Sequence, residues 1–254
     1  MKDDRISDAD DLLKGERLLV VAAHTADWLW RCSGTIAKYL KRGAQVHVLC
    51  LTYGARGESG ALWKKDGASM DGVKQTRYRE SAAAAEQLGL TGFEIWDFDD
   101  CPLMMSEAIL QKLNEKIREV RPTAIITHDP SDDTNADHGM ASEIVFRAAL
   151  MSRQKGIETE GIDPTGKTQI YGFEPSQTER SGYVPQVYID ITDVWEQKNA
   201  AMACITAQPN TPNVHTRIGT HRGWQAARLP GGKGIRYAET FSTRFPLILK
   251  EKLP

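Results

Sequence analysis

The sequence predicts an α/β fold in which parallel strands alternate with helices. Short apolar runs, typical of buried strands, recur through residues 17–152. Between these runs lie longer segments with helical patterns, and several of them begin at serine or stop at glycine. This alternation is typical of a parallel sheet with crossover helices. With 254 residues, the chain has the length of one large domain, and we expect a single domain over residues 1–254.

The first part of the chain contains four strand–helix units. The predicted strands are residues 17–23, 44–51, 93–98 and 123–127. The predicted helices are residues 35–41, 73–88, 106–120 and 140–151. Gly89 supplies a stop for the second helix, and Ser106 is a suitable N-cap for the third. The segments 53–72 and 128–137 are polar and predict loops.

The second part of the chain carries a weaker pattern. Residues 169–173 and 187–191 predict two more strands, and residues 195–206 predict a helix. Beyond Gln208, proline, asparagine, glycine and arginine cluster as far as Gly234. We therefore expect residues 207–254 to form a C-terminal extension that acts as a lid, an oligomer interface or both.

Composition excludes several classes of protein. Lys and Arg total 32 and Asp and Glu total 34, so the net charge of -2 gives no general attraction to nucleic acid or anionic membranes. Mean hydropathy is -0.44, and no apolar run approaches the roughly 20 residues that span a bilayer. The first residues lack the apolar segment of a signal peptide. The four cysteines form no CxxC pair, which predicts free thiols in a reducing cytoplasm.

Polar side chains follow three of the predicted strands. His24 and Asp27 come directly after the first strand, and Glu58 lies in a glycine-rich loop after the second. His128 follows the fourth strand, and His138 comes ten residues later, after an aspartate-rich loop. Ligands of open α/β sheets bind outside the carboxyl ends of the strands. We therefore expect these side chains to gather at one edge of the sheet.

His24, Asp27 and His138 together offer two imidazoles and one carboxylate. This set suits Zn²⁺ and leaves a coordination position for water or substrate. Asp129, Asp132 or Asp137 could orient a ligating imidazole through its second nitrogen. Taken singly, such histidines are usually structural and aspartate-rich loops are usually solvated turns. Their combination at two strand ends favours a metal site.

These motifs resemble those of the LmbE/PIG-L zinc deacetylase superfamily. His-Thr-Ala-Asp at 24–27, followed by Ser-Gly-Thr-Ile-Ala at 33–37, resembles the family's AHPDDE motif and the helix start after it. Asn-Ala-Asp-His at 135–138 resembles its HPDH or NPDH motif. The resemblance implies a Rossmann-like fold with a mostly parallel sheet, helices on both faces, and one zinc ion. It also implies that His24, Asp27 and His138 are the zinc ligands.

The departures from the deacetylase pattern are informative. Ala26 stands where deacetylases place the aspartate that acts as general base, and Asn135 stands where many have a histidine. A methyl group cannot accept a proton from water, so a deacetylase mechanism would lack its usual base here. Thr25 and Trp28 also depart from the motif.

One branch of the superfamily resembles the chain more closely. Residues 24–31 and 51–63 look like the 4-oxalomesaconate hydratases, and segments at 101–103, 173–175 and 190–198 extend the likeness. Those enzymes hydrate a carbon–carbon double bond conjugated to a keto acid, and they lack the deacetylase base. They commonly carry histidine where this chain has Ser176, which leaves the second proton donor open.

The resemblance implies a zinc-dependent hydro-lyase of aromatic-acid catabolism, which acts on an unsaturated keto polycarboxylate such as 4-oxalomesaconate. We expect Glu58 to transfer a proton and His128 to orient a ligand or donate a proton. The expected substrate-binding residues are Arg31, Arg56, Arg79 and Asn135.

Two alternatives remain open. One is a zinc-dependent N-deacetylase of an N-acetylglucosamine-type substrate, with Glu58 or His128 replacing the missing base. The other is a catalytically silent metal-binding homologue. In either enzymatic case we expect a cytoplasmic homo-oligomer with a small-molecule substrate.

Overall fold

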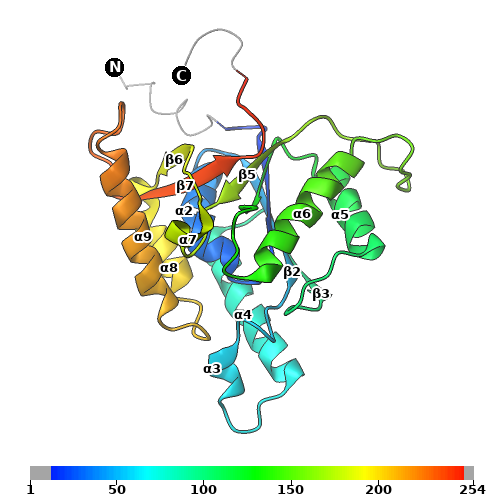
Figure 1. Cartoon of the computed structure of the whole chain (residues 1–254), viewed down its shortest axis with the longest axis horizontal. Coiled ribbons are helices and arrows are strands. Elements are labelled where there is room, and N and C mark those ends of the chain that lie inside the picture. The colour runs from blue at the N-terminus through cyan, green and yellow to red at the C-terminus, as the bar shows by residue number, and fades with distance from the viewer. Residues whose placement is uncertain (1–12, 249–254) are drawn as a thin grey trace, which may run out of the picture.

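The computed structural model describes residues 13–248, which form one seven-stranded sheet between two layers of helices (Figure 1). In their order across the sheet, the strands are β3 (Gly92–Phe98), β2 (Gln45–Thr52), β1 (Arg17–Ala22), β4 (Ala124–His128), β5 (Gln169–Phe173), β7 (Ala238–Thr243) and β6 (Val187–Asp190). The first five strands in this order pair in parallel, whereas β7 is antiparallel to both of its neighbours.

The helices are α2 (Asp27–Lys41), α3 (Gly60–Trp63), α4 (Met70–Leu88), α5 (Glu107–Val120), α6 (Ala136–Met151), α7 (Thr178–Ser181), α8 (Trp195–Met202) and α9 (Thr211–Ala226), with a 3₁₀ turn η1 at Thr192–Val194. Within residues 13–248 none of them combines the length and the apolar character that crossing a bilayer requires.

The strands at the centre of the sheet are apolar on both sides because two cores flank them. In β1, Leu18 and Val20 pack against α2, α4 and α8, while Leu19 and Val21 pack against α5 and α6. Figure 1 shows α8 and α9 on one side of the sheet and α5 and α6 on the other. The predicted α/β class, with a mostly parallel sheet and helices on both faces, is confirmed.

The order of the strands creates a crevice at one edge of the sheet. Strand β1 pairs with β2 on one side and with β4 on the other. The connections that follow β1 and β4 therefore leave the sheet on opposite faces. Ligand sites of open α/β sheets form at such a reversal point.

Several boundaries follow from local capping. The Ser106 hydroxyl accepts from the Ile109 N–H at 3.3 Å, and Gly89 ends α4 with a φ of 73°, as predicted. Helix α6 begins four residues before the predicted start, because Asn135 accepts from the Asp137 N–H at 3.0 Å. His138 therefore lies in a helix and not in a loop.

Other boundaries differ from the prediction. Helix α2 starts at Asp27, eight residues before the predicted start at residue 35, and α8 ends at Met202. The segment 53–72, predicted to be a loop, contains α3 and the first turn of α4.

The C-terminal part of the described chain completes the sheet. Strand β7 lies between β5 and β6, and α9 packs against α2 and β7, although the sequence predicted neither element. Glu239 of β7 accepts from the Gly34 and Thr35 N–H groups of α2 at 2.9 and 2.7 Å. The role of the C-terminal extension as a lid or an oligomer interface stays a prediction.

A buried ion pair fastens this region to the rest of the fold. Lys198 of α8 lies 2.6 Å from Glu239 and also donates to the Trp30 carbonyl at 2.7 Å. Gly34 allows Glu239 to lie close to α2, because a Cβ at position 34 would lie 2.8 Å from Ile191 and 3.0 Å from Glu239.

We expect Glu239→Ala to lower the free energy of unfolding by about 3–5 kcal/mol, since Lys198 would stay buried without a counter-charge. Glu143→Ala is the control, because its ion pair with Arg147 is exposed and contributes less than about 1 kcal/mol. Urea unfolding monitored by circular dichroism measures both variants. Equal midpoints for the two would show that the buried pair does not anchor the C-terminal region.

Candidate metal centre

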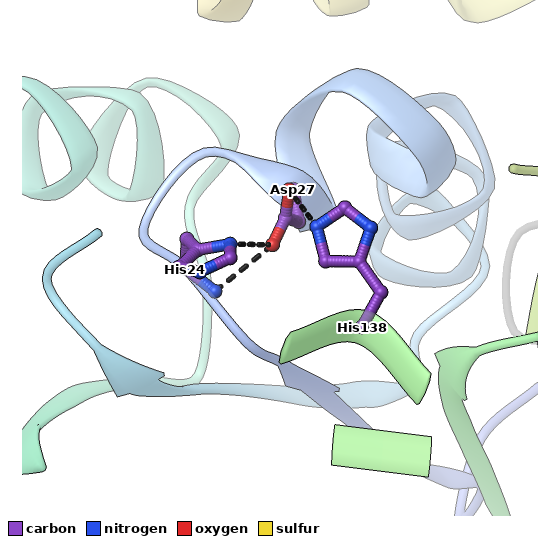
Figure 2. A group of neighbouring side chains, drawn as sticks. All are labelled: His24, Asp27 and His138. Atoms are coloured by element: carbon purple, nitrogen blue, oxygen red, sulfur yellow. Dashed lines mark hydrogen bonds and ion pairs between the residues drawn. The ribbon is translucent and has the colours of Figure 1, made fainter. Parts of the chain in front are cut away.

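The candidate site lies where the carboxyl ends of β1 and β4 meet (Figure 2). His24 follows β1, Asp27 is the first residue of α2, and His138 lies in the first turn of α6. One ligand atom from each of the three side chains lies within 4.8 Å of the other two. The structure thus brings together three residues of which the first and last lie 114 positions apart in the sequence.

Asp27 stands between the two imidazoles. Its Oδ2 lies 3.0 Å from His24 Nδ1, and its Oδ1 lies 3.5 Å from His138 Nε2. The backbone N–H of His24 also donates to Asp27 Oδ2 at 2.9 Å, which fixes the carboxylate. All three side chains are buried.

The outer nitrogen of each imidazole is held by a further carboxylate. Asp137 lies 3.1 Å from His24 Nε2, and Asp132 lies 2.9 Å from His138 Nδ1. When these nitrogens donate, the inner nitrogens direct lone pairs toward Asp27, and His138 Nε2 has no hydrogen-bond partner. Lone pairs and a carboxylate that converge in this way fit a divalent metal ion.

The electrostatics of the cluster favour positive charge. Burial lowers the pKa of His24, but Asp27 and Asp137 more than offset it and raise the pKa to about 10. Burial raises the pKa of Asp27, but His138 and His24 hold it well below its usual range. The same negative charges would stabilise a bound cation.

The two orienting aspartates come from adjacent elements: Asp132 lies in the loop between β4 and α6, and Asp137 lies in the first turn of α6. Asp137 also accepts from the backbone N–H groups of Cys101 and Leu103 at 2.8 and 2.7 Å. Burial raises its pKa, but His24 and these N–H groups bring it down to about 2. Of the three aspartates that the sequence offered for orienting an imidazole, Asp129 is the one that contacts none and instead accepts from Ser131 and Ser242.

His128 lies beside the cluster with no exposed surface. Its ring stacks on His138 with centroids 4.1 Å apart, and its Nε2 accepts from the Ala23 N–H at 2.9 Å. Burial and the charge of His138 lower its pKa to about 3, so it is neutral near pH 7. This environment suits a residue that supports His138 and leaves no solvent path for its own proton.

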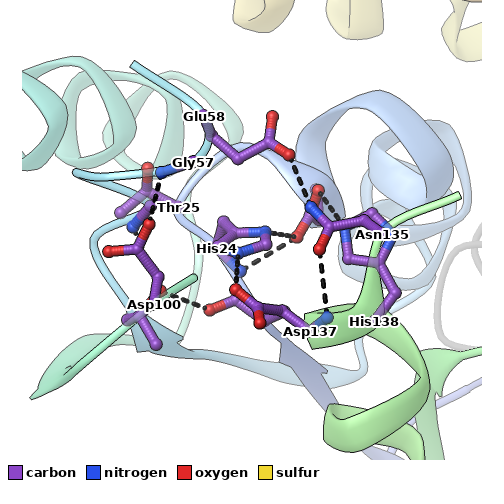
Figure 3. Close-up of polar contacts among 12 residues, drawn as sticks. His24, Thr25, Gly57, Glu58, Asp100, Asn135, Asp137 and His138 are labelled. Carbon is purple, nitrogen blue, oxygen red and sulfur yellow. Dashed lines mark hydrogen bonds and ion pairs between the residues drawn. The ribbon is translucent and has the colours of Figure 1, made fainter. Parts of the chain in front are cut away.

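Glu58 reaches the same group of side chains from the loop after β2 (Figure 3). Its Oε1 accepts from Asn135 Nδ2 at 2.8 Å, and its Oε2 accepts from Gln208 Nε2 at 2.9 Å. Asn135 therefore caps α6 with one atom and holds Glu58 with another. Glu58 is partly exposed, unlike the three ligand candidates.

The loop that carries Glu58 is fixed close to His24. Asp100, buried after β3, accepts from the Arg56 and Gly57 N–H groups at 2.9 and 2.7 Å. Gly54 has a φ of 64°, and a Cβ there would lie 3.0 Å from His24 and 3.1 Å from Glu58. Asp100 was not among the predicted site residues, although its place directly after a strand was a usable signal.

Two of the predicted substrate-binding arginines lie near the site in different settings. Arg31 is buried and donates to Asp132 at 3.0 Å and to the Ser176 hydroxyl at 3.0 Å. Arg56 is exposed, and its Nη2 lies 2.7 Å from Asp99.

The structure does not bring Arg79 to the site. Arg79 is exposed on α4 and donates within its own helix, to the Gln75 carbonyl and the Thr76 hydroxyl. Arg77, two residues earlier, is 1% exposed and donates to Gln208 Oε1 at 3.4 Å. Gln208 lies in the segment where the sequence pattern is weak, so nothing in the sequence indicated this link.

Comparison with known proteins identifies related chains. The family model described as GlcNAc-PI de-N-acetylase (PIG-L) matches residues 19–149. The chain is 36% identical over 233 residues to the 4-oxalmesaconate hydratase of Pseudomonas putida. The matched region covers 91% of this chain and 90% of that relative. It is 28% identical over 194 residues to the diacetylchitobiose deacetylase of Thermococcus kodakarensis, covering 74% and 68%.

Solved structures agree with this placement. GalB, the 4-carboxy-2-hydroxymuconate hydratase of Pseudomonas putida, matches with a TM-score of 0.89 and 35% identity over 94% of this chain and 100% of its own. The N,N'-diacetylchitobiose deacetylase of Pyrococcus horikoshii matches with a TM-score of 0.73 at 19% identity over 96% and 92%, and supports the fold alone. Because the family model spans the elements that carry His24, Asp27 and His138, and because a relative matches over nine-tenths of both chains, this chain belongs to the PIG-L (LmbE-like) family.

Proposed function

We propose that this chain is a zinc-dependent hydratase that adds water to the conjugated double bond of an unsaturated keto polycarboxylate such as 4-oxalomesaconate. The observation that carries the proposal is the position of the carboxylate that could act as a base, which is not at residue 26 but at residue 58. Position 26 holds a buried alanine, while Glu58 is fixed beside His24 on a different loop. The similarity to the Pseudomonas putida hydratase over nine-tenths of the chain supports the same reaction.

His24, Asp27 and His138 are the proposed zinc ligands. Zinc accepts two imidazoles and a carboxylate and keeps a position open for a further ligand. Bound there, the ion would act as a Lewis acid for the negative charge that develops on the keto-acid oxygen during hydration. Asp137 and Asp132 keep the two imidazoles in the orientation that presents their inner nitrogens.

Glu58 is the proposed base for the attacking water. Each of its oxygens accepts one amide N–H and keeps a second lone pair for a proton. Partial exposure gives the carboxylate access to substrate and solvent. His128, which is buried and neutral, is proposed to support His138 and not to transfer a proton to substrate.

A polycarboxylate substrate needs cationic or polar partners at the open side of the site. Arg56 is the proposed partner, because its side chain is 43% exposed on the loop that carries Glu58. Arg31 is proposed to orient Asp132, since its guanidinium is buried and bonded within the protein. Arg79 is not proposed as a substrate-binding residue, because its contacts lie within α4.

Ser176 has a hydroxyl bonded to Arg31, and the donor of the second proton stays open. The homo-oligomeric state, the cytoplasmic location and the place in aromatic-acid catabolism stay predictions.

An assay with two substrates tests the proposed function. We expect the purified protein, loaded with zinc, to remove the conjugated-enone absorbance of 4-oxalomesaconate and to release no acetate from N-acetylglucosamine derivatives. Removing the metal with a chelator should abolish the hydration, and adding zinc should restore it. The alternative is an N-deacetylase, the activity named in the description of the family model, and acetate release without hydration would establish it. A zinc-loaded protein inactive in both assays would support a silent metal-binding homologue.

A further inference from the structure

Resting on the proposed role of Glu58, we propose that Gln208, itself held by Arg77, is a positioning residue that orients the Glu58 carboxylate for proton transfer. Gln208 lies between α8 and α9, 150 residues from Glu58 in the sequence. Its Nε2 donates to Glu58 Oε2 at 2.9 Å. Asn135 binds the other oxygen at 2.8 Å, so the two amides together fix the plane of the carboxylate.

The orientation of the Gln208 amide is determined by its second partner. Arg77 Nη1 donates to Gln208 Oε1 at 3.4 Å. A guanidinium can only donate, so the amide must turn its oxygen to Arg77 and its NH₂ group to Glu58. A flipped amide would place its NH₂ group against the guanidinium and its oxygen against the carboxylate, and both contacts would be repulsive.

Helix α4 fixes both ends of this connection. Arg77 is 1% exposed and cannot swing into solvent. One turn along the helix, Glu80 accepts from the backbone N–H groups of Thr206 and Ala207 at 3.0 and 2.9 Å and from the Thr206 hydroxyl at 2.6 Å. These bonds hold the backbone directly before Gln208 against α4.

The geometry leaves the reacting lone pairs accessible. Each amide occupies one lone pair of one Glu58 oxygen, and each oxygen keeps another for water or substrate. Neither amide can exchange its proton at a useful rate near neutral pH, so Gln208 acts through Glu58 and not on the substrate. Small errors in the position of a reacting group cost large factors in rate, which gives Gln208 an influence on kcat.

Gln208→Leu tests the proposal. We expect kcat for hydration to fall roughly 10-fold with KM changed less than about twofold. The Glu58 carboxylate would lose a hydrogen bond that orients it, while no contact with the substrate would be lost. In a Glu58→Gln background the same change should have almost no further effect. Gln225→Leu is the matched control, because Gln225 also accepts from an arginine, Arg222, at 2.6 Å, and we expect its kcat to match wild type.

Gln208→Glu provides a second variant of nearly the same shape. It places a carboxylate beside Glu58, and two carboxylates in contact cannot both ionise easily. We expect the acidic limb of the pH profile of kcat/KM to move upward by about one pH unit or more, with activity recovering at alkaline pH.

The outcomes separate this inference from the function on which it rests. An inactive wild type in the hydration assay would overturn the proposed function and this inference with it. If the wild type is active, the effect of Gln208→Leu on kcat is compared in the wild-type and Glu58→Gln backgrounds. The same factor in both backgrounds would overturn only this inference. An unmoved pH profile for Gln208→Glu would do the same.

Discussion

His138→Ala is expected to lower kcat/KM for hydration by roughly 10³-fold. The change removes an inner nitrogen that faces Asp27 at 3.5 Å and has no other partner. With two ligands left, the site would hold a divalent cation weakly and lose several kcal/mol of charge stabilisation. Steady-state kinetics at a fixed zinc concentration measures the loss.

His221→Ala is the matched control for this substitution. His221 is exposed on α9 and stacks on Trp224 with centroids 5.9 Å apart, so its removal should leave kcat/KM unchanged. A His138→Ala enzyme with wild-type kinetics would remove His138 from the reaction. A loss that excess zinc reverses would show weakened binding with the reaction intact.

Glu58→Gln is expected to lower kcat by roughly 10² or more with little change in KM. The glutamine keeps the shape of the side chain but cannot take a proton from water. The hydrogen bonds from Asn135 and Gln208 would partly survive, so the loss reports on proton transfer and not on the loop.

Glu119→Gln is the control for the loss of a carboxylate, because Glu119 is exposed on α5 and pairs with Lys116. Metal content should be the same in wild type, Glu58→Gln and Glu119→Gln. Near-normal turnover in Glu58→Gln would reduce Glu58 to a loop residue and would leave the base for hydration unassigned.

The gathering of the three proposed ligands was predictable because its signals are local. His24 and Asp27 follow a run of apolar residues that reads as a buried strand, and His138 follows a polar loop after another. Strand order places such segments at one edge of the sheet whatever the details of packing. The start of α6 was not predicted in the same way: Asn135 caps the helix, whereas the sequence prediction began it at residue 140.

Which of Arg77 and Arg79 points into the protein depends on tertiary packing, so the sequence prediction selected Arg79 although Arg77 is the buried residue. Both arginines lie on α4, a helix with no strong apolar stripe to indicate its inner face. Arg77 is directed inward because the segment before α9 packs there, and Glu80 holds that segment. Contacts of this kind join residues more than 100 positions apart and leave no local pattern.

Strand β7 escaped prediction for a related reason. Glu239 breaks the apolar pattern of the strand, and a charged residue usually marks an exposed position. Its partner Lys198 lies 41 residues earlier on α8, and only their contact makes burial of both charges tolerable. The pairing becomes visible only once the fold brings α8 and β7 together.

The metal content of the purified protein tests the central claim most directly. After incubation with excess zinc and thorough dialysis, elemental analysis should find one metal ion per chain in wild type and almost none in His138→Ala. A wild-type protein that retains no metal, or a His138→Ala variant that retains as much as wild type, would contradict a cation held by His24, Asp27 and His138.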